Sequence, residues 1–217
     1  MSATKEFENK RWNEHNQTLA FRHAKALEMI NEGESVLDVG CGDGLLMEAL
    51  TEKGSLVAGI DLSEEGVRKC KEKGLTASVL DVSCEVLPFQ NDEFDVVVIL
   101  DVLEHLYAPG NLLEEAKRVS KKNIIVGVPN FNSLPARIQV LLGRVPENNK
   151  PNKGHVYWFN ERVLRDMMKQ HELSPVIIAT NVFWEDKFLV GRLIKFLARI
   201  KPSLFSLSFV AKLEKNV

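Results

Sequence analysis

Short apolar runs alternate with helix-like segments along most of the chain. Before residue 130 the runs are apolar at nearly every position, which is typical of strands that are buried on both faces. The segments between them carry apolar residues about every three to four positions, the period of a helix. In order, the runs are SVLDV, SLVAGID, TASVLD, FDVVVIL and NIIVGV, then PVIIATNVF and LFSLSFVAKL. This alternation predicts a mainly parallel sheet covered by helices.

Three parts of the chain depart from this alternation. Residues 7–30 read as one helix with an irregular apolar stripe that includes Trp12 and Leu19. The stretch VSCEVLPFQNDE, between the third and fourth runs, leaves room for a very short helix at most. The last two runs lie beyond the parallel core, and we expect them to form a hairpin-like edge around residues 185–202.

The overall composition narrows the class of protein. The formal net charge of -2 provides no basic field for a nucleic-acid backbone. Cys41, Cys70 and Cys84 are odd in number and lack metal-type spacing, which fits reduced thiols. The N-terminus lacks the apolar segment of a signal peptide, and no stretch reaches the length of a membrane span. These features predict a cytoplasmic protein without a nucleic-acid partner.

The stretch VLDVGCGDG, residues 36–44, ends an aliphatic strand in a carboxylate and alternate glycines. Glycine tolerates positive φ and carries no Cβ, so a ligand can come close to the backbone of such a turn. The stretch that follows has helical spacing and ends in Gly54. The sequence therefore predicts a strand, a glycine turn that cradles a ligand, and a helix start. The glycines could instead serve only the turn and the packing of the helix.

The glycine spacing bears on which nucleotide binds. A dinucleotide fingerprint reads G-x-G-x-x-G, whereas this turn reads G-x-G-x-G with Asp43 inside it. A pyrophosphate at this helix start would meet the Asp43 carboxylate, and like charges repel. The spacing therefore disfavours a nicotinamide-dependent oxidoreductase and favours a neutral or cationic nucleoside.

Two further carboxylates follow the next strands. Asp61, in GIDLS, lies about where an acidic residue accepts the ribose hydroxyls of a nucleoside, and Asp81 ends SVLD. The carboxyl ends of parallel strands meet at one edge of a sheet, so we expect Asp38, Asp61 and Asp81 to line one crevice. Both later residues also have a local alternative, because Asp61 could cap the helix near Ser63 and Asp81 could cap a turn.

The motifs VLDVGCGDG, GIDLS, LPFQNDEFDVVVILDVLEHL and NIIVGVPN together resemble class I S-adenosylmethionine-dependent methyltransferases. The resemblance implies a Rossmann-like α/β fold whose seven-stranded, mainly parallel sheet has an antiparallel edge and helices on both faces. It also implies S-adenosyl-L-methionine as cofactor and S-adenosyl-L-homocysteine as product. The implied cofactor-binding residues are Asp38, Gly40, Cys41 and Gly42 at the methionine part, Asp61 with its neighbour Leu62 at the ribose, Asp81 with Val82 at the adenine, and Leu100 with Asp101 at the methionyl side.

We expect residues 1–217 to form a single methyltransferase domain. Its parts are an N-terminal helical cover (1–33), a cofactor-binding core (35–128), a substrate-side insertion (129–159) and C-terminal helices and edge strands (160–217). The insertion is expected to fold over the crevice and exclude water. Its motifs PNF and GR-P, with a later histidine before a phenylalanine, resemble the MetW family. The tail resembles the group that includes the ubiquinone O-methyltransferases.

His105 in LEHLYAP and His155 in GHVYWF are the candidate catalytic residues. A histidine near neutrality can take the proton of a hydroxyl or amine during methyl transfer, although each histidine could instead fix its own loop. Asp101, Glu104 and His105 have the spacing of one helical face, which can hold a divalent ion but is equally an ordinary helix start. We therefore predict no metal site.

The predicted function is methyl transfer to an oxygen or nitrogen atom of a small-molecule or lipid-like acceptor. The MetW resemblance leaves one alternative, a regulatory or interaction subunit of a methionine-pathway acyltransferase that keeps the cofactor fold. Arg22 or His23 could reach the methionine carboxylate, because related enzymes lay an N-terminal helix across the cofactor. The basic, amphipathic segment at residues 187–201 could contact a membrane. The expected acceptor-binding residues of the insertion are Phe131, Arg137, Arg144, His155, Tyr157, Trp158 and Phe159.

Overall fold

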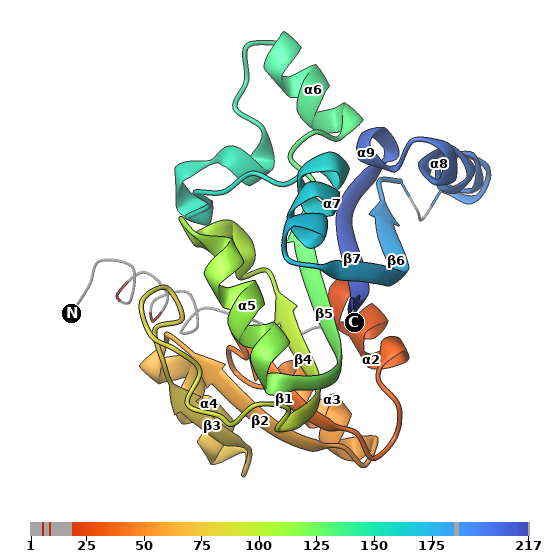
Figure 1. Cartoon of the computed structure of the whole chain (residues 1–217). Coiled ribbons are helices and arrows are strands. Elements are labelled where there is room, and N and C mark those ends of the chain that lie inside the picture. Colours follow the sequence, from red (N-terminus) through yellow and green to blue (C-terminus); the bar gives the residue numbers. More distant parts are fainter. Residues whose placement is uncertain (1–5, 7–8, 10–18, 185–186, 217) are drawn as a thin grey trace.

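A computed structural model describes residues 6, 9, 19–184 and 187–216. Within these residues seven strands form one sheet in the order β3-β2-β1-β4-β5-β7-β6 (Figure 1). Strands β1 to β5 pair in parallel, whereas β7 is antiparallel to both β5 and β6. The strands are β1 (Ser35–Val39), β2 (Leu56–Asp61), β3 (Thr76–Val79), β4 (Phe94–Leu100), β5 (Ser120–Pro129), β6 (Leu173–Val182) and β7 (Ser206–Lys215). The predicted seven-stranded, mainly parallel sheet with an antiparallel edge is confirmed.

Helices cover both faces of this sheet. One core holds side chains of α5 and α7 against the strands, and a second core holds side chains of α2 and α3 against the opposite face. The central strand β4 supplies both cores, because Val97 and Ile99 point into the first and Val96 and Val98 into the second. The helices are α2 (Phe21–Met29), α3 (Leu45–Glu52), α4 (Glu64–Glu72), η1 (Leu103–His105), α5 (Pro109–Val119), α6 (Leu134–Leu141), η2 (Glu147–Asn149), η3 (Pro151–Lys153), α7 (Glu161–Gln170), α8 (Phe188–Ile200) and α9 (Pro202–Phe205).

The strand order sets the place where a ligand can bind. The chain moves outward from β1 to β2 and β3, and then crosses back to place β4 on the other side of β1. The connections after β1 and β4 therefore leave the sheet in opposite directions and open a crevice at the carboxyl ends of these strands. The glycine turn follows β1, and the LEH stretch follows β4.

The N-terminal helix is shorter than predicted. Leu19 and Ala20 are not helical, and Ala20 has the extended backbone of a helix cap at φ -73° and ψ 163°. Helix α2 therefore begins at Phe21, and the prediction of one continuous helix over residues 7–30 is wrong at this point. Trp12, part of the predicted stripe, lies outside the described residues. Ile30 of the predicted stripe is buried in the second core, and Phe21 and Leu27 pack against it; Ala26 and Met29, outside the predicted stripe, are buried there as well.

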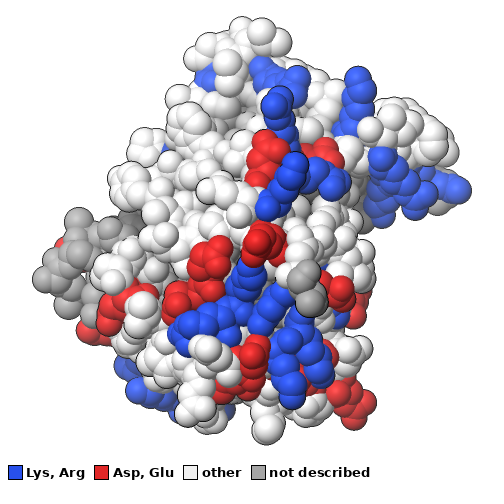
Figure 2. Space-filling view, in the orientation of Figure 1, with Lys and Arg blue, Asp and Glu red and all other residues white. Residues whose placement is uncertain are grey.

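Two C-terminal features match the sequence pattern. Helix α7 begins directly after Asn160, whose side chain accepts a hydrogen bond from the Val163 amide at 3.0 Å. The antiparallel strands β6 and β7 precede and follow α8 and α9 in the chain. Lys and Arg side chains gather over α8 (Figure 2). None of the helices within the described residues has the length and apolar character needed to cross a membrane.

Candidate functional site

A cavity of about 380 Å³ lies at the carboxyl ends of β1, β2, β3 and β4. Every predicted cofactor-binding residue except Gly42 lines it, and so does His105, whereas His155 does not. The lining side chains and backbone belong to Arg22, His23, Asp38, Gly40, Cys41, Asp43, Leu45, Leu46, Ile60, Asp61, Leu62, Leu80, Asp81, Val82, Ser83, Leu100, Asp101, Val102, His105, Leu106 and Tyr107. The motifs that the sequence places far apart therefore meet at one cavity.

The glycines of this turn are needed for close packing within the protein as well as for the cavity. Gly40 has φ +80°, and its amide donates to the Ile60 carbonyl at 2.8 Å, which ties the turn to β2. A Cβ at Gly40 would lie 2.3 Å from Val102 Cγ2, and one at Gly44, with φ +83°, would lie 2.5 Å from Leu75 Cδ1. Part of the need for glycine is therefore internal packing, the alternative that the sequence left open. Gly40 and Cys41 still line the cavity.

Cys41 is a packing residue as well as part of the cavity lining. Its side chain belongs to a small core with Met47 and Cys70. The hydrogen bond with Cys70, burial and nearby carboxylates raise the pKa of the Cys41 thiol well above its usual range. A thiol held in this state is a poor nucleophile.

Asp61 joins two parts of the cavity wall. Its Oδ2 accepts from the Gly42 amide at 2.8 Å, and its Oδ1 accepts from the Ser63 amide at 2.7 Å. The carboxylate is only 8% exposed, so these charge-assisted bonds are shielded from water. Asp61 therefore fixes the glycine turn against the start of α4, and it also lines the cavity. Gly42 faces this network rather than the cavity.

Asp81, which follows the next strand, likewise takes part in a local hydrogen-bond network and lines the cavity. Strand β3 ends at Val79, before the Asp81 that the sequence places at the strand end. The Asp81 Oδ1 accepts from the Ser83 amide at 3.0 Å and from the Ser83 hydroxyl at 2.5 Å. This turn cap is the local alternative that the sequence left open, and Asp81 with Val82 still lines the cavity.

Buried carboxylates make one wall of the cavity acidic. Asp38, Asp43 and Asp61 are 4%, 2% and 8% exposed. Burial, and then the neighbouring Asp61, raise the pKa of Asp38 to about 7. A cation in the cavity would relieve both effects by stabilising the ionised carboxylate. The wall therefore favours a cationic ligand over an anionic one.

Asp101 connects the sheet to the N-terminal helix. This residue has φ +53°, which is unusual for a residue other than glycine, and it lies directly after β4. Its Oδ2 is 2.8 Å from Nε of Arg22 on α2, and both side chains line the cavity. Arg22 and His23, the two residues that could reach the methionine carboxylate, both line the cavity, and the structure pairs Arg22 with Asp101.

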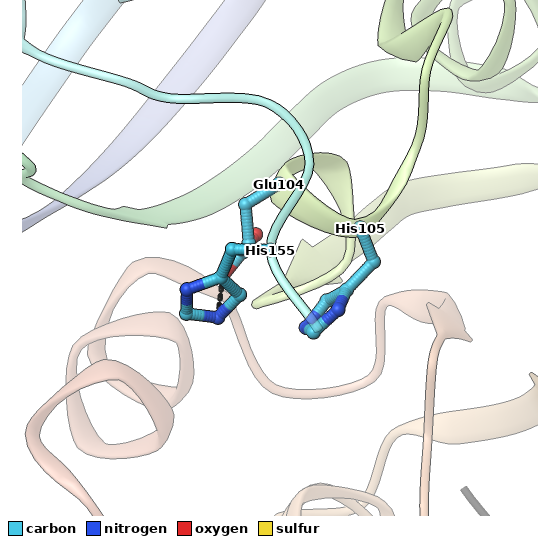
Figure 3. Close-up of side chains that lie close together, drawn as sticks. All are labelled: Glu104, His105 and His155. Atoms are coloured by element: carbon cyan, nitrogen blue, oxygen red, sulfur yellow. Dashed lines mark ion pairs between the residues drawn. The ribbon is translucent and has the colours of Figure 1, made fainter. Parts of the chain in front are cut away.

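The insertion brings His155 to the loop that carries His105. The two rings lie 4.8 Å apart between centroids, and His155 Nε2 is 3.9 Å from Oε1 of Glu104 (Figure 3). Phe131, also in the insertion, packs edge-on against His155 at 5.4 Å. The two candidate catalytic histidines therefore meet, although only His105 lines the cavity.

The aromatic cluster of the insertion divides between core and surface. Phe159 is fully buried in the first core, so its predicted role as a wall for the acceptor is wrong. Trp158 is 62% exposed, and its ring lies 6.5 Å from that of Phe131. Tyr107 lines the cavity and is 87% exposed, but the sequence prediction missed it. Its position shortly after β4 is a usable signal, because loops at strand ends surround such a cavity.

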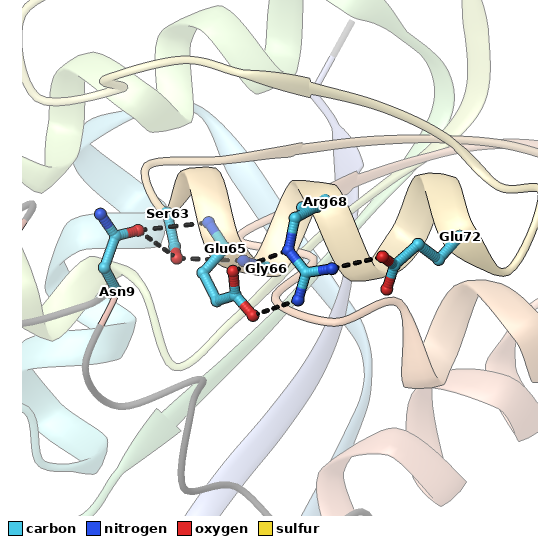
Figure 4. A network of polar contacts seen from close by, with 6 residues as sticks. All are labelled: Asn9, Ser63, Glu65, Gly66, Arg68 and Glu72. Atoms are coloured by element: carbon cyan, nitrogen blue, oxygen red, sulfur yellow. Dashed lines mark hydrogen bonds and ion pairs between the residues drawn. The ribbon is translucent and has the colours of Figure 1, made fainter.

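A residue of the N-terminal region lies at the start of α4. Asn9 Oδ1 accepts from the Ser63 hydroxyl at 2.8 Å and from the Glu65 amide at 3.3 Å (Figure 4). The Ser63 hydroxyl in turn accepts from the Gly66 amide as the helix cap. Asn9 thereby joins the network that holds Asp61, next to the cavity.

Solved structures define the class of fold. The chain is similar to a SAM-dependent methyltransferase from Archaeoglobus fulgidus, with a TM-score of 0.66 and 21% identity over 89% of this chain and 91% of that one. It is also similar to magnesium protoporphyrin IX methyltransferase from Synechocystis, solved with bound SAH, with a TM-score of 0.69 and 17% identity over 98% of each chain. The fold is that of the class I methyltransferases.

Sequence comparison gives the family. The family described as methionine biosynthesis protein MetW matches residues 21–172, and the chain belongs to this family. A ubiquinone biosynthesis O-methyltransferase from Methylococcus capsulatus is 38% identical over 117 residues, 51% of this chain and 49% of that protein. One from Dechloromonas aromatica is 40% identical over 108 residues, 48% of this chain and 47% of that protein. The chain spans about half the length of the curated relatives it matches.

Proposed function

We propose that this chain is an S-adenosylmethionine-dependent methyltransferase that acts on an oxygen or nitrogen atom of a small-molecule or lipid-like acceptor. The observation that carries the proposal is the acidic cavity at the point where β1 and β4 diverge. S-adenosylmethionine is a cationic nucleoside and therefore fits a wall of buried carboxylates. The fold class and the names of the curated relatives support the same reaction.

The cavity residues have distinct roles in this proposal. Asp38 and the turn at Gly40 and Cys41 hold the methionine part, and Gly42 supports the turn through its bond to Asp61. Asp61 with Leu62 holds the ribose, and Asp81 with Val82 contacts the adenine. Leu100 and Asp101 flank the methionyl side chain. These assignments are those that the resemblance to class I methyltransferases implies, and the lining of the cavity supports them for every residue except Gly42.

In this proposal catalysis depends mainly on the positioning of the acceptor relative to the methyl group. When bound, S-adenosylmethionine supplies a methyl group that is already activated on a sulfonium, so the protein has to orient the acceptor and exclude water. His105 lines the cavity and is the residue placed to accept a proton from an acceptor. His155 lies behind it and supports its orientation.

Family membership supports a second candidate function. The MetW family is described by methionine biosynthesis, which is consistent with a regulatory or interaction subunit of an acyltransferase. Incubating the isolated chain with labelled S-adenosylmethionine and a metabolite extract separates the two functions. Label transferred to a metabolite supports the enzyme. Co-purification with an acyltransferase and no transferred label supports the subunit.

Calorimetry tests the cofactor assignment. We expect S-adenosylmethionine and S-adenosylhomocysteine to bind, and a nicotinamide dinucleotide not to bind. Because the pKa of Asp38 is raised to about 7 and a cationic ligand favours its ionised form, binding should release a proton near neutrality. Cofactor affinity should therefore rise from about pH 6 to about pH 8, by at most about tenfold per pH unit.

The control for this pH dependence is Asp38→Asn, which keeps the shape of the side chain and removes its titration. The variant should show a flatter pH profile than the wild type, and the difference between the two profiles isolates Asp38 from other titrating groups. Identical slopes in both proteins would remove Asp38 from the cofactor site. Binding of the dinucleotide alone would overturn the cofactor assignment itself.

We propose peripheral contact with an anionic membrane through α8. Ile194 and Ala198 pack inward, whereas a row of apolar side chains and an adjacent row of basic ones are exposed. A helix of this pattern lies at the lipid interface, with its basic row near anionic headgroups. The apolar row is Leu189, Leu193, Phe196 and Ile200, and the basic row is Arg192, Lys195 and Arg199. In this proposal the protein is located in the cytoplasm, as the sequence predicts, and contacts the membrane from that side.

Vesicle sedimentation tests this contact. The protein should sediment with phosphatidylglycerol vesicles, and less with phosphatidylcholine vesicles, because the basic row needs anionic headgroups. The double variant Leu193→Ser and Phe196→Ser should reduce sedimentation at least about tenfold, since two apolar side chains no longer enter the interface. The matched control is Val176→Ser and Ile177→Ser, two exposed apolar positions on β6. Equal losses in the two double variants would contradict a specific role for α8.

A further inference from the structure

The insertion completes a cluster of metal-ligating side chains beside the cavity. One ligand atom from each of Glu104, His105 and His155 lies within 4.8 Å of the other two (Figure 3). We propose that these residues form a site for one divalent transition-metal ion, of which zinc is the best match. The sequence analysis predicted no metal site, because the local pattern contains only Asp101, Glu104 and His105 and their spacing is equally that of an ordinary helix start.

The backbone explains why this set of residues differs from the one that the sequence suggested. Residues Leu103–His105 form a single 3-10 turn, and Asp101 precedes it with its side chain paired to Arg22. Asp101 is therefore directed toward α2, and His155 occupies the third position of the cluster. The insertion thus supplies a ligand that no local pattern around residue 104 contains.

Both histidines are oriented as metal ligands usually are. His155 Nδ1 is 2.7 Å from the Asn148 carbonyl, and His105 Nδ1 is 3.2 Å from the Gly154 carbonyl. If each Nδ1 carries a proton and donates it to its carbonyl, Nε2 is the unprotonated nitrogen of each ring and the one that can coordinate an ion. Such outer hydrogen bonds fix the tautomer and the ring orientation of metal-binding histidines.

Backbone hydrogen bonds to Glu104 also fix the loop around His155. The Glu104 carbonyl accepts from the amides of Val156 and Tyr157, both at 2.9 Å. These bonds hold the segment that carries His155 directly over Glu104. The carboxylate of Glu104 is 1% exposed, and a cation next to it would offset the cost of burying its charge.

The donor set indicates which ions fit. Two imidazole nitrogens and one carboxylate oxygen suit zinc and other first-row transition metals, whereas magnesium and calcium prefer sites made of oxygen ligands. In a tetrahedral zinc site with bonds near 2.1 Å, the ligand atoms lie about 3.4 Å apart. The three side chains therefore need to move inward by about an ångström to close on the ion.

The position of the cluster suggests what the ion does, and this step rests on the proposed function. His105 lines the cavity and His155 belongs to the insertion, so the ion would lie between the cofactor side and the acceptor side. Three protein ligands leave a fourth position open for an acceptor hydroxyl, whose pKa the ion would lower. With its Nε2 on the ion, His105 no longer acts as the base proposed above. The hydroxyl proton passes to water, the oxygen forms a bond to the methyl carbon, and the carbon–sulfur bond breaks to leave the neutral thioether. The site therefore favours an oxygen acceptor over a nitrogen acceptor.

Metal titration of the purified protein, after treatment with a chelator, tests the site without using activity. Calorimetry should show about one zinc ion bound per chain, with at least about tenfold weaker binding of magnesium. His155→Gln and His105→Gln should each weaken zinc binding at least about tenfold, and zinc should raise the melting temperature of the wild type but not of these two variants. Circular dichroism of each variant reports that the fold is retained.

His171→Gln is the matched control. His171 Nδ1 lies 2.6 Å from Glu114 Oε1, so this variant also removes a histidine next to a glutamate, but at a place that does not line the cavity. It should bind zinc as the wild type does. Zinc affinity that is equal in the wild type, His105→Gln and His155→Gln would overturn the metal site. Loss of zinc binding in all three histidine variants would point to nonspecific binding and would overturn it as well.

The metal site and the proposed function fail separately. A protein that binds S-adenosylhomocysteine but no zinc keeps the function and loses the metal site. A protein that binds zinc through Glu104, His105 and His155 but no S-adenosylhomocysteine keeps the metal site and loses the function.

Discussion

Replacing Asp61 with alanine is expected to weaken S-adenosylmethionine binding about a hundredfold or more. The variant removes the acceptor of the Gly42 and Ser63 amides, so the glycine turn loses its link to α4. It also removes the proposed acceptor of the ribose hydroxyls. A hydrogen bond to a charged group contributes about 1.5 to 3 kcal/mol, and loss of two such bonds at the lower value corresponds to a factor of about a hundred. Calorimetry with S-adenosylhomocysteine measures the change.

Asp95→Ala is the matched control for this prediction. Asp95 also accepts hydrogen bonds from a backbone amide and a hydroxyl, those of Ser35, both at 3.0 Å. These bonds and Lys122 lower the pKa of Asp95 to about 2, so its carboxylate, like that of Asp61, is fixed by donors within the protein. Asp95 is not among the residues that line the cavity.

The two aspartate variants separate cofactor binding from stability. Both should lower the melting temperature, because each leaves backbone or hydroxyl donors without their carboxylate. Only Asp61→Ala should lower cofactor affinity. If Asp61→Ala binds S-adenosylhomocysteine within about threefold of the wild type, Asp61 has only its structural role between the glycine turn and α4.

The sheet could be predicted because its signal is local and strong. Strands such as β4 supply side chains to two cores, so nearly every position is apolar and the pattern stands out against the amphipathic helices. Predicting the strand ends then placed Asp38, Asp61 and Asp81 around one cavity, although β3 ends at Val79, before Asp81. The cofactor side of the candidate site is therefore largely readable from motifs at the ends of strands.

The roles that the sequence missed depend on contacts between distant segments. Gly42 is part of a glycine motif, but the bond from its amide to Asp61 turns it away from the cavity. The aromatic run at residues 157–159 gives no sign that Phe159 enters the core while Trp158 stays exposed. The pairing of His155 with Glu104 depends on amide bonds from residues 156 and 157, which no pattern within the insertion specifies.

Replacing residues 136–152 with a Gly/Ser linker is expected to abolish methyl transfer and to leave cofactor affinity within a few-fold of the wild type. This range includes most of α6, which has no buried residue, and it contains none of the residues that line the cavity. Removing it should therefore cost little folding energy. The linker should start after Pro135, because Ser133 is buried and Leu134 packs against the cluster around Val182.

The loss of transfer follows from what the segment holds in place. It contains Asn148, whose carbonyl orients His155, and it contains Arg137 and Arg144, the proposed polar contacts of the acceptor. A matched control replaces the exposed loop at residues 90–93, which lies at the opposite end of β4. That variant should keep both cofactor binding and transfer of label to the extract.

Three results distinguish the possible roles of the insertion. Transfer lost with S-adenosylhomocysteine affinity intact places acceptor recognition in the insertion. Affinity lost together with transfer, in a protein whose circular dichroism is still native, would mean that the insertion belongs to the cofactor site. Transfer retained would remove residues 136–152 from catalysis, and acceptor recognition would then lie with residues outside this range, among which Tyr107 is exposed at the cavity. The variant keeps His155 but lacks the Asn148 carbonyl that contacts its ring. The zinc affinity of this variant therefore shows how strongly the orientation of the His155 ring depends on the replaced segment.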